Sequence, residues 1–114
     1  TLFLAHGAVL ANEAAIKTMA RITMNLNHFP SDDDKATLKG IIDSDDSSLE
    51  AADIALAIAN MEHKVLEEDV ERLQDIIDDE RSAGDARTLA SILLRINHSP
   101  SDEDKKALAA LAGS

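Results

Sequence analysis

The chain has 114 residues, a formal net charge of −11, no cysteine and two aromatic residues, both phenylalanine. This length allows one hydrophobic core, and the absence of cysteine excludes disulfides, thiolate metal sites and cysteine nucleophiles. The acidity argues against direct nucleic-acid binding, which requires clustered Lys and Arg, and no apolar run is long enough to span a membrane. With only four Gly and two Pro, the sequence predicts a single all-α domain over residues 1–114.

Histidines recur every 35 residues, at His28, His63 and His98, and apolar columns recur at the same interval. Three of these columns are Met19/Ile54/Leu89, Ala20/Ala55/Ala90 and Leu38/Leu73/Leu108. A period of this length is typical of helical hairpins. We therefore expect three degenerate 35-residue hairpin repeats, 12–46, 47–81 and 82–114, in a compact bundle or an open solenoid. Residues 1–11 are either the start of the first helix or the tail of an earlier unit, because Phe3 falls in the Leu38 column.

Local signals place the helices of the first unit. Asn12 is expected to cap the unit, and the first helix is predicted over about 3–27. Asn27 is expected to end that helix in a left-handed conformation. Pro30 then prevents continuation, and Ser31 is predicted to cap a helix over 32–43, whose first turn is acidic as the helix dipole favours.

The middle unit lacks this corner. It has Val65-Leu66 where the other units have Pro-Ser, and apolar residues continue through this point at spacings of three and four. Ser47 is expected to cap the unit in a capping box with Glu50. The sequence therefore predicts one long central helix over about 48–80.

The last unit repeats the pattern of the first. Ser82 and Asp85 are expected to form a capping box, Asn97 to end a helix over 84–97, and Ser101 to cap a helix over 102–112. Together these assignments predict a bundle of about five helices, with the long central helix packed between two hairpins.

The three histidines are a candidate metal site or proton-transfer site. Metal ligands must converge on one point, whereas equivalent residues of stacked repeats lie about 10 Å apart. We therefore expect His28, His63 and His98 to form a row near helix ends, and we predict no metal and no cofactor. The acidic stretch 41–50 matches the calcium-loop pattern only at Asp43 and Asp45, so it is predicted to be a solvated loop.

Acidic side chains concentrate in the middle unit, where residues 47–81 carry eleven acidic and three basic residues. Like charges at i, i+4 repel one another, and acidic side chains at a helix C-terminus are disfavoured by the helix dipole. A cationic partner would relieve that repulsion, so these residues are the candidate partner-binding site. The candidates are Glu67, Glu71, Asp75, Asp78 and Asp79.

No nucleophile motif or phosphate loop is present, so the sequence predicts a non-enzymatic protein–protein interaction module, such as an adaptor, regulator or assembly subunit. The alternative is an acidic inhibitor that mimics nucleic acid and uses its 67–80 stripe to occupy a DNA-binding protein. The expected partner is another protein with a basic surface, without direct nucleic-acid or membrane binding, and self-association into a homo-oligomer is left open.

Overall fold

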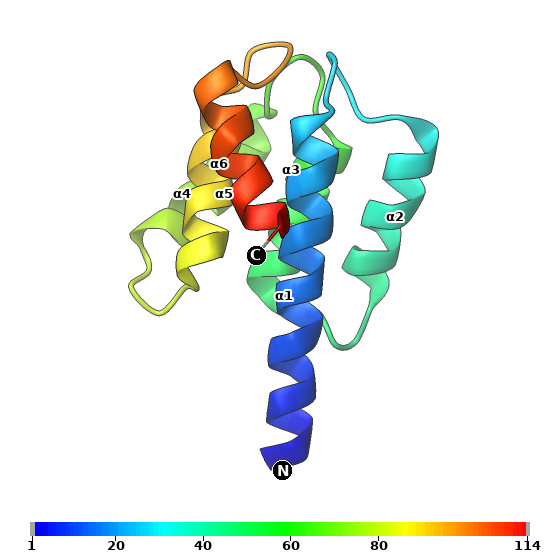
Figure 1. Ribbon diagram of the computed structural model, residues 1–114, viewed down its shortest axis with the longest axis vertical. Coiled ribbons are helices and arrows are strands. Elements are labelled where there is room, and N and C mark those ends of the chain that lie inside the picture. Colours follow the sequence, from blue (N-terminus) through cyan, green and yellow to red (C-terminus); the bar gives the residue numbers. More distant parts are fainter. Residues whose placement is uncertain (1, 114) are drawn as a thin grey trace.

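The computed structural model describes residues 2–113, with side chains from residue 13 onward (Figure 1). Residues 2–113 contain six α-helices and no strand. The expected all-helical fold is therefore confirmed. The expected roles of the Phe3 and Asn12 side chains lie outside the described side chains, although the backbone of residue 12 lies inside the first helix rather than at a start. The six helices are α1 Leu2–Met24, α2 Asp32–Asp43, α3 Leu49–Ala59, α4 Glu67–Asp78, α5 Gly84–Arg95 and α6 Asp102–Gly113.

The helix contacts close into a ring of three pairs, α2 with α3, α4 with α5 and α6 with α1, and Figure 1 shows the last helix beside the first. Helices α1, α3 and α5 contact one another at the centre. Each remaining helix packs on the next central helix along the chain: α2 on α3, α4 on α5, and α6 back on α1. The described chain therefore forms a compact bundle with a radius of gyration of 13.1 Å, and its last helix returns to the first.

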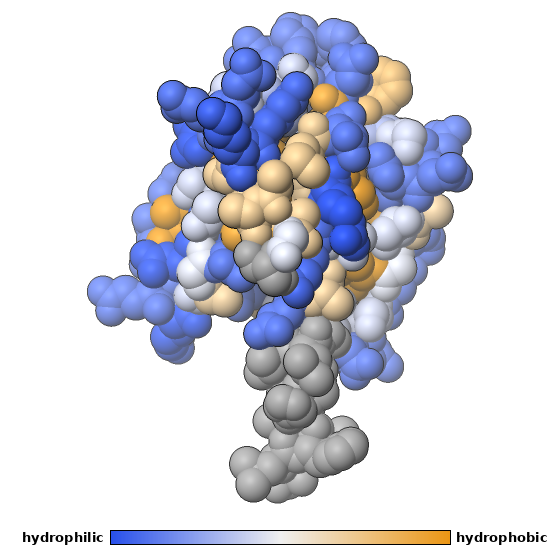
Figure 2. All heavy atoms as spheres, in the orientation of Figure 1, coloured by the Kyte–Doolittle hydropathy of each residue, from blue (hydrophilic) through white to orange (hydrophobic). Residues whose placement is uncertain are grey.

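Small and aliphatic side chains fill the centre of this ring. Ala20, Ala55 and Ala90 are fully buried, one on each central helix, and their small size lets the three backbones approach closely. The residues before them, Met19, Ile54 and Leu89, are also fully buried. Because the buried residues are mostly apolar, with Asp69 as the charged exception among the described residues, the face in Figure 2 is mostly hydrophilic. Among the described helices, none combines the length and apolar character needed to cross a membrane.

The predicted long central helix is wrong. Helix α3 ends at Ala59, α4 begins at Glu67, and residues 60–66 turn the chain without the Pro-Ser pair of the other corners. Leu66 occupies the N-cap position but makes no side-chain capping bond. Packing explains the turn, because it returns Leu73 and Ile76 to the core, where both are buried. A continuous helix would carry these side chains away from α5, so tertiary burial outweighs local helix propensity.

The expected helix ends are correct in some places and shifted in others. Ser31 and Ser101 accept hydrogen bonds from the backbone N–H groups three residues later, both at 3.1 Å, as expected of capping serines. In contrast, the caps of α3 and α5 are Ser48 and Ala83, one residue beyond the predicted Ser47 and Ser82. The capping boxes with Glu50 and Asp85 therefore do not form. Helices α1 and α5 end at Met24 and Arg95, before the predicted ends at 27 and 97.

Restoring the missing corner residues is expected to stabilise the protein. In the double variant Val65→Pro/Leu66→Ser, proline replaces a residue whose N–H makes no backbone hydrogen bond among the described residues. Leu66 has φ −67°, close to the −66° of the capping Ser31. We expect urea denaturation to show a free energy of unfolding about 1 kcal/mol higher than that of the parent. The new serine cap and the lower entropy of the unfolded chain with proline increase stability, and the loss of apolar contacts of Val65 and Leu66 offsets part of the gain. A loss of ~3 kcal/mol, the cost of proline inside a helix, would instead indicate a continuous helix.

Candidate metal centre

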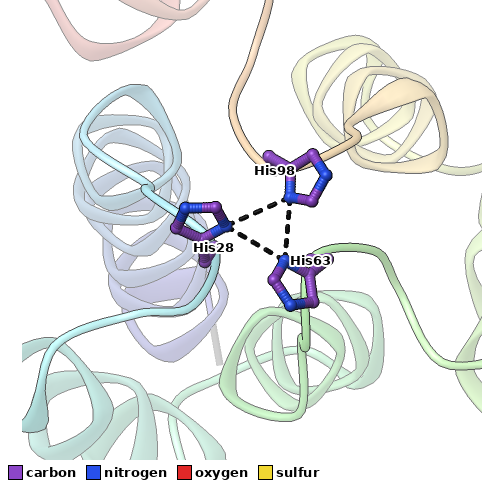
Figure 3. Close-up of side chains that lie close together, drawn as sticks. All are labelled: His28, His63 and His98. Carbon is purple, nitrogen blue, oxygen red and sulfur yellow. Dashed lines mark hydrogen bonds between the residues drawn. The ribbon is translucent and has the colours of Figure 1, made fainter.

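Three histidines meet where the three corners converge, at one end of the bundle (Figures 1 and 3). His28 follows α1, His63 follows α3 and His98 follows α5. Their Nδ1 atoms lie 3.0 Å (28–63), 3.1 Å (28–98) and 2.8 Å (63–98) apart. The expected row of separated histidines is therefore wrong. Ring closure is the reason, because it brings the three corners to a common axis, whereas an open stack would separate them. We call these residues the histidine triad.

The backbone of the histidine triad forms a closed cycle of hydrogen bonds. The N–H of His28 donates to the carbonyl of His98 at 2.7 Å, that of His63 to His28 at 2.7 Å, and that of His98 to His63 at 2.8 Å. The corner after each central helix thus supplies one histidine whose backbone N–H donates to one neighbour and whose carbonyl accepts from the other. This cycle fixes the three Cα positions without any side chain.

Each triad residue also has a backbone conformation that is rare for a residue with a side chain. The φ angles are 72° for His28, 69° for His63 and 75° for His98, and these are the positive-φ non-glycine residues in the described chain. The left-handed residues expected at Asn27 and Asn97 are therefore displaced by one position. Strained backbone of this kind persists where the surrounding structure imposes it, and it concentrates at functional sites.

The imidazole rings point their Nδ1 atoms at one another (Figure 3). Neighbouring rings stand edge to face, with centroids 4.6–4.9 Å apart and interplanar angles of 76–82°. A ring nitrogen carries either a proton or a lone pair. Among three mutually adjacent Nδ1 atoms, at least two must therefore be alike, so one contact sets proton against proton or lone pair against lone pair. A shared cation removes this conflict, because all three nitrogens then present lone pairs to it.

The donor set suits a divalent transition metal. Imidazole nitrogen is a preferred ligand of zinc, copper, iron and nickel, and the three ligand atoms lie within 4.8 Å of one another. Among residues 13–113, no carboxylate joins this group as a fourth ligand. The triad lies at the surface, so solvent can reach a bound ion. Asp43 and Asp45 belong to no comparable group in the described chain.

Polar contacts behind the triad hold the corners in place. Asp69 is completely buried and accepts hydrogen bonds from Arg72 at 2.6 Å and Asn60 at 3.3 Å. In the last corner, Arg95 reaches Asp104 at 2.8 Å. The Asn60–Asp69 and Arg95–Asp104 contacts join the end of one helix to the start of the next, whereas the Arg72–Asp69 contact lies within α4.

The sequence-predicted acidic residues lie elsewhere, on α4 and just beyond it. Glu67, Glu71, Asp75 and Asp78 are exposed, while Asp79 is partly buried. The first three form no ion pair among the described residues. Asp78 accepts a hydrogen bond from Gln74 at 3.1 Å. A side-chain hydrogen bond from Arg81 lowers the pKa of Asp79, whereas burial raises the pKa of nearby Asp53 against the opposing effect of Arg72.

Comparison with known proteins identifies no relative: no family model, curated protein or solved structure matches the chain. The arrangement of its own residues therefore carries the functional argument. The 35-residue spacing of the histidines was the available sequence signal for the site. That signal singled out the three histidines. Because a stacked arrangement was expected, however, they were predicted to lie in a row and not in contact with one another.

Proposed function

We propose that this protein binds a divalent transition metal through the Nδ1 atoms of His28, His63 and His98. The observation that carries the proposal is the mutual approach of three ring nitrogens to 2.8–3.1 Å, which no assignment of protons satisfies at every contact. The backbone cycle supports it further, because it holds the ligand-bearing residues in place before an ion arrives. Binding would then require little ordering of the chain.

Calorimetric titration with Ni²⁺, Co²⁺ or Zn²⁺ tests this proposal. We expect one ion per chain and a loss of affinity in His63→Asn of at least the ~10–100-fold typical of removing even an outer-shell partner. Asparagine tolerates positive φ, so this variant keeps the backbone and removes the ligand.

His6→Ala is the matched control for that titration, since it removes the one histidine outside the triad. It should bind metal like the parent. Equal affinity of His63→Asn and the parent for all three metals, or no binding by the parent, would exclude a metal site at the triad.

We also infer that the chain consists of three 35-residue hairpin repeats related by approximate threefold symmetry. Support comes from the cyclic packing of the helix pairs, the cyclic backbone bonds and the equal spacing of the apolar columns. In this interpretation the triad is one position used three times.

A second proposed function concerns the exposed carboxylates of α4. We propose that this surface binds a basic protein partner, in a non-enzymatic adaptor role or as a nucleic-acid-mimicking inhibitor. The supporting observation is that Glu67, Glu71 and Asp75 are exposed without ion pairs among the described residues. A cationic surface would relieve their mutual repulsion.

Charge-reversal variants test whether a basic peptide binds the α4 surface or is attracted only by the net negative charge of the protein. The variant Glu67→Lys/Glu71→Lys/Asp75→Lys should lose at least ~10-fold in affinity for a lysine-rich peptide, and parent binding should weaken as salt rises. The control Asp45→Lys/Asp46→Lys/Asp85→Lys changes net charge equally at exposed sites off α4. Equal losses in both variants would show that total charge, and not the α4 surface, attracts the peptide.

A further inference from the structure

We propose that the metal held by the histidine triad has three adjacent coordination positions open to solvent and uses two of them to bind a small chelating anion with two oxygen donors. Hydroxamates and 2-oxo or 2-hydroxy carboxylates belong to this class. The inference rests on the proposed metal-binding function and deepens it, because it assigns both the coordination geometry and the ligand class.

The spacing of the ligand atoms favours a facial, six-coordinate ion. Nδ1 separations of 2.8, 3.0 and 3.1 Å, with metal–nitrogen bonds of about 2.0–2.1 Å, correspond to N–metal–N angles of roughly 85–100°. An octahedral ion requires about 90°, whereas a tetrahedral ion would need nitrogens ~3.3–3.4 Å apart. The backbone cycle holds the three Cα positions, since each triad residue is hydrogen-bonded to both others at 2.7–2.8 Å, so such spreading would have to come from rotation of the side chains.

The remaining positions face away from the bundle. All three protein ligands come from the end of the fold where the corners meet (Figure 3), and no fourth donor from residues 13–113 joins them. Three ligands on one face of an octahedron leave three mutually adjacent positions on the opposite face. Two adjacent positions accept one bidentate ligand, which gains affinity because its second donor binds intramolecularly.

The charge of the site selects an anion. Three neutral imidazoles leave the full +2 charge of the ion uncompensated, and this local charge dominates its surroundings. The residues that flank His63 are Glu62 and Lys64, both exposed, which offset each other.

Absorption spectroscopy of the Co²⁺-loaded protein, titrated with acetohydroxamate, tests the inference. Acetate, with a weaker chelating geometry, is the matched control ligand. We expect the weak visible bands of six-coordinate Co²⁺, a spectral change that saturates at one hydroxamate per ion, and at least ~10-fold tighter binding than acetate. Equilibrium dialysis should show that the metal stays with the protein, and metal-free protein should bind neither ligand.

The outcomes separate this inference from the proposed function. If Co²⁺ binds at the triad but shows intense tetrahedral bands, or if hydroxamate binds no better than acetate or strips the metal, the facial chelate site is wrong while metal binding stands. If the parent binds no metal, both fail. The variant His63→Asn should lose the ternary complex along with the metal.

Discussion

The Asp69→Ala variant is expected to unfold with a free energy about 3 kcal/mol lower than that of the parent. Asp69 is fully buried and accepts hydrogen bonds from Arg72 and Asn60. Removing one member of a buried ion pair typically costs 3–5 kcal/mol, because the remaining groups lose their partner. The lower end applies, since the Arg72 side chain is 45 % exposed and water can reach it. Urea denaturation followed by circular dichroism measures the change.

Asp104→Ala is the matched control for this experiment. Asp104 occupies the equivalent position in the last corner, but its side chain is 14 % exposed, its Arg95 partner is 57 % exposed, and Ser101 still caps the helix. We expect a loss of only ~1 kcal/mol, as for a surface pair. If Asp69→Ala costs no more than Asp104→Ala, the buried aspartate is not what holds the middle corner together.

Replacing all three triad histidines with glycine should stabilise the fold while abolishing metal binding. An L-residue in the left-handed region destabilises the folded state by about 1–2 kcal/mol. Glycine avoids this penalty, but it loses ~0.5–1 kcal/mol more conformational entropy on folding, and the difference is the expected gain at each position. Summed over His28, His63 and His98, each at positive φ, the expected gain is about 2 kcal/mol. Denaturation in the absence of metal measures the gain, and titration with Ni²⁺ measures the loss of binding.

The corresponding triple alanine variant is the control, because alanine removes the imidazoles but keeps the unfavourable φ. It should lose metal binding without gaining stability. If the glycine variant is instead less stable than the parent by 1 kcal/mol or more, contacts among the histidines hold the fold together. The strain would then have a structural purpose, and the functional interpretation of the triad would lose its support.

Local chemistry explains which parts of the fold could be predicted. The helix over 32–43 matches α2 because its start is coded within a few residues, by Pro30, Ser31 and three acids in the first turn. The same chemistry begins α6 after Ser101. The 35-residue recurrence also singled out the apolar column Leu38, Leu73 and Leu108, and all three are fully buried.

The middle corner could not be predicted from such local signals. Val65 and Leu66 neither stop a helix nor cap one, and the apolar spacing continues through them. In the outer corners, Pro ends one helix and Ser caps the next. In the middle corner the turn is held instead by Asp69, which is buried and hydrogen-bonded to Asn60 and Arg72, and by the backbone cycle that includes His63. Both depend on residues brought together only in the folded chain.

The sequence by itself determined that the protein is acidic, all-helical and built around an aliphatic core, and that three of its histidines recur every 35 residues. These properties follow from composition, periodicity and caps, which act over a few residues. Only the tertiary structure decided that the chain turns at residues 60–66 and that the three histidines share one point. The physical reason is closure: once α6 packs back on α1, the three corners surround an axis instead of following a line, and no local sequence signal distinguishes these two arrangements.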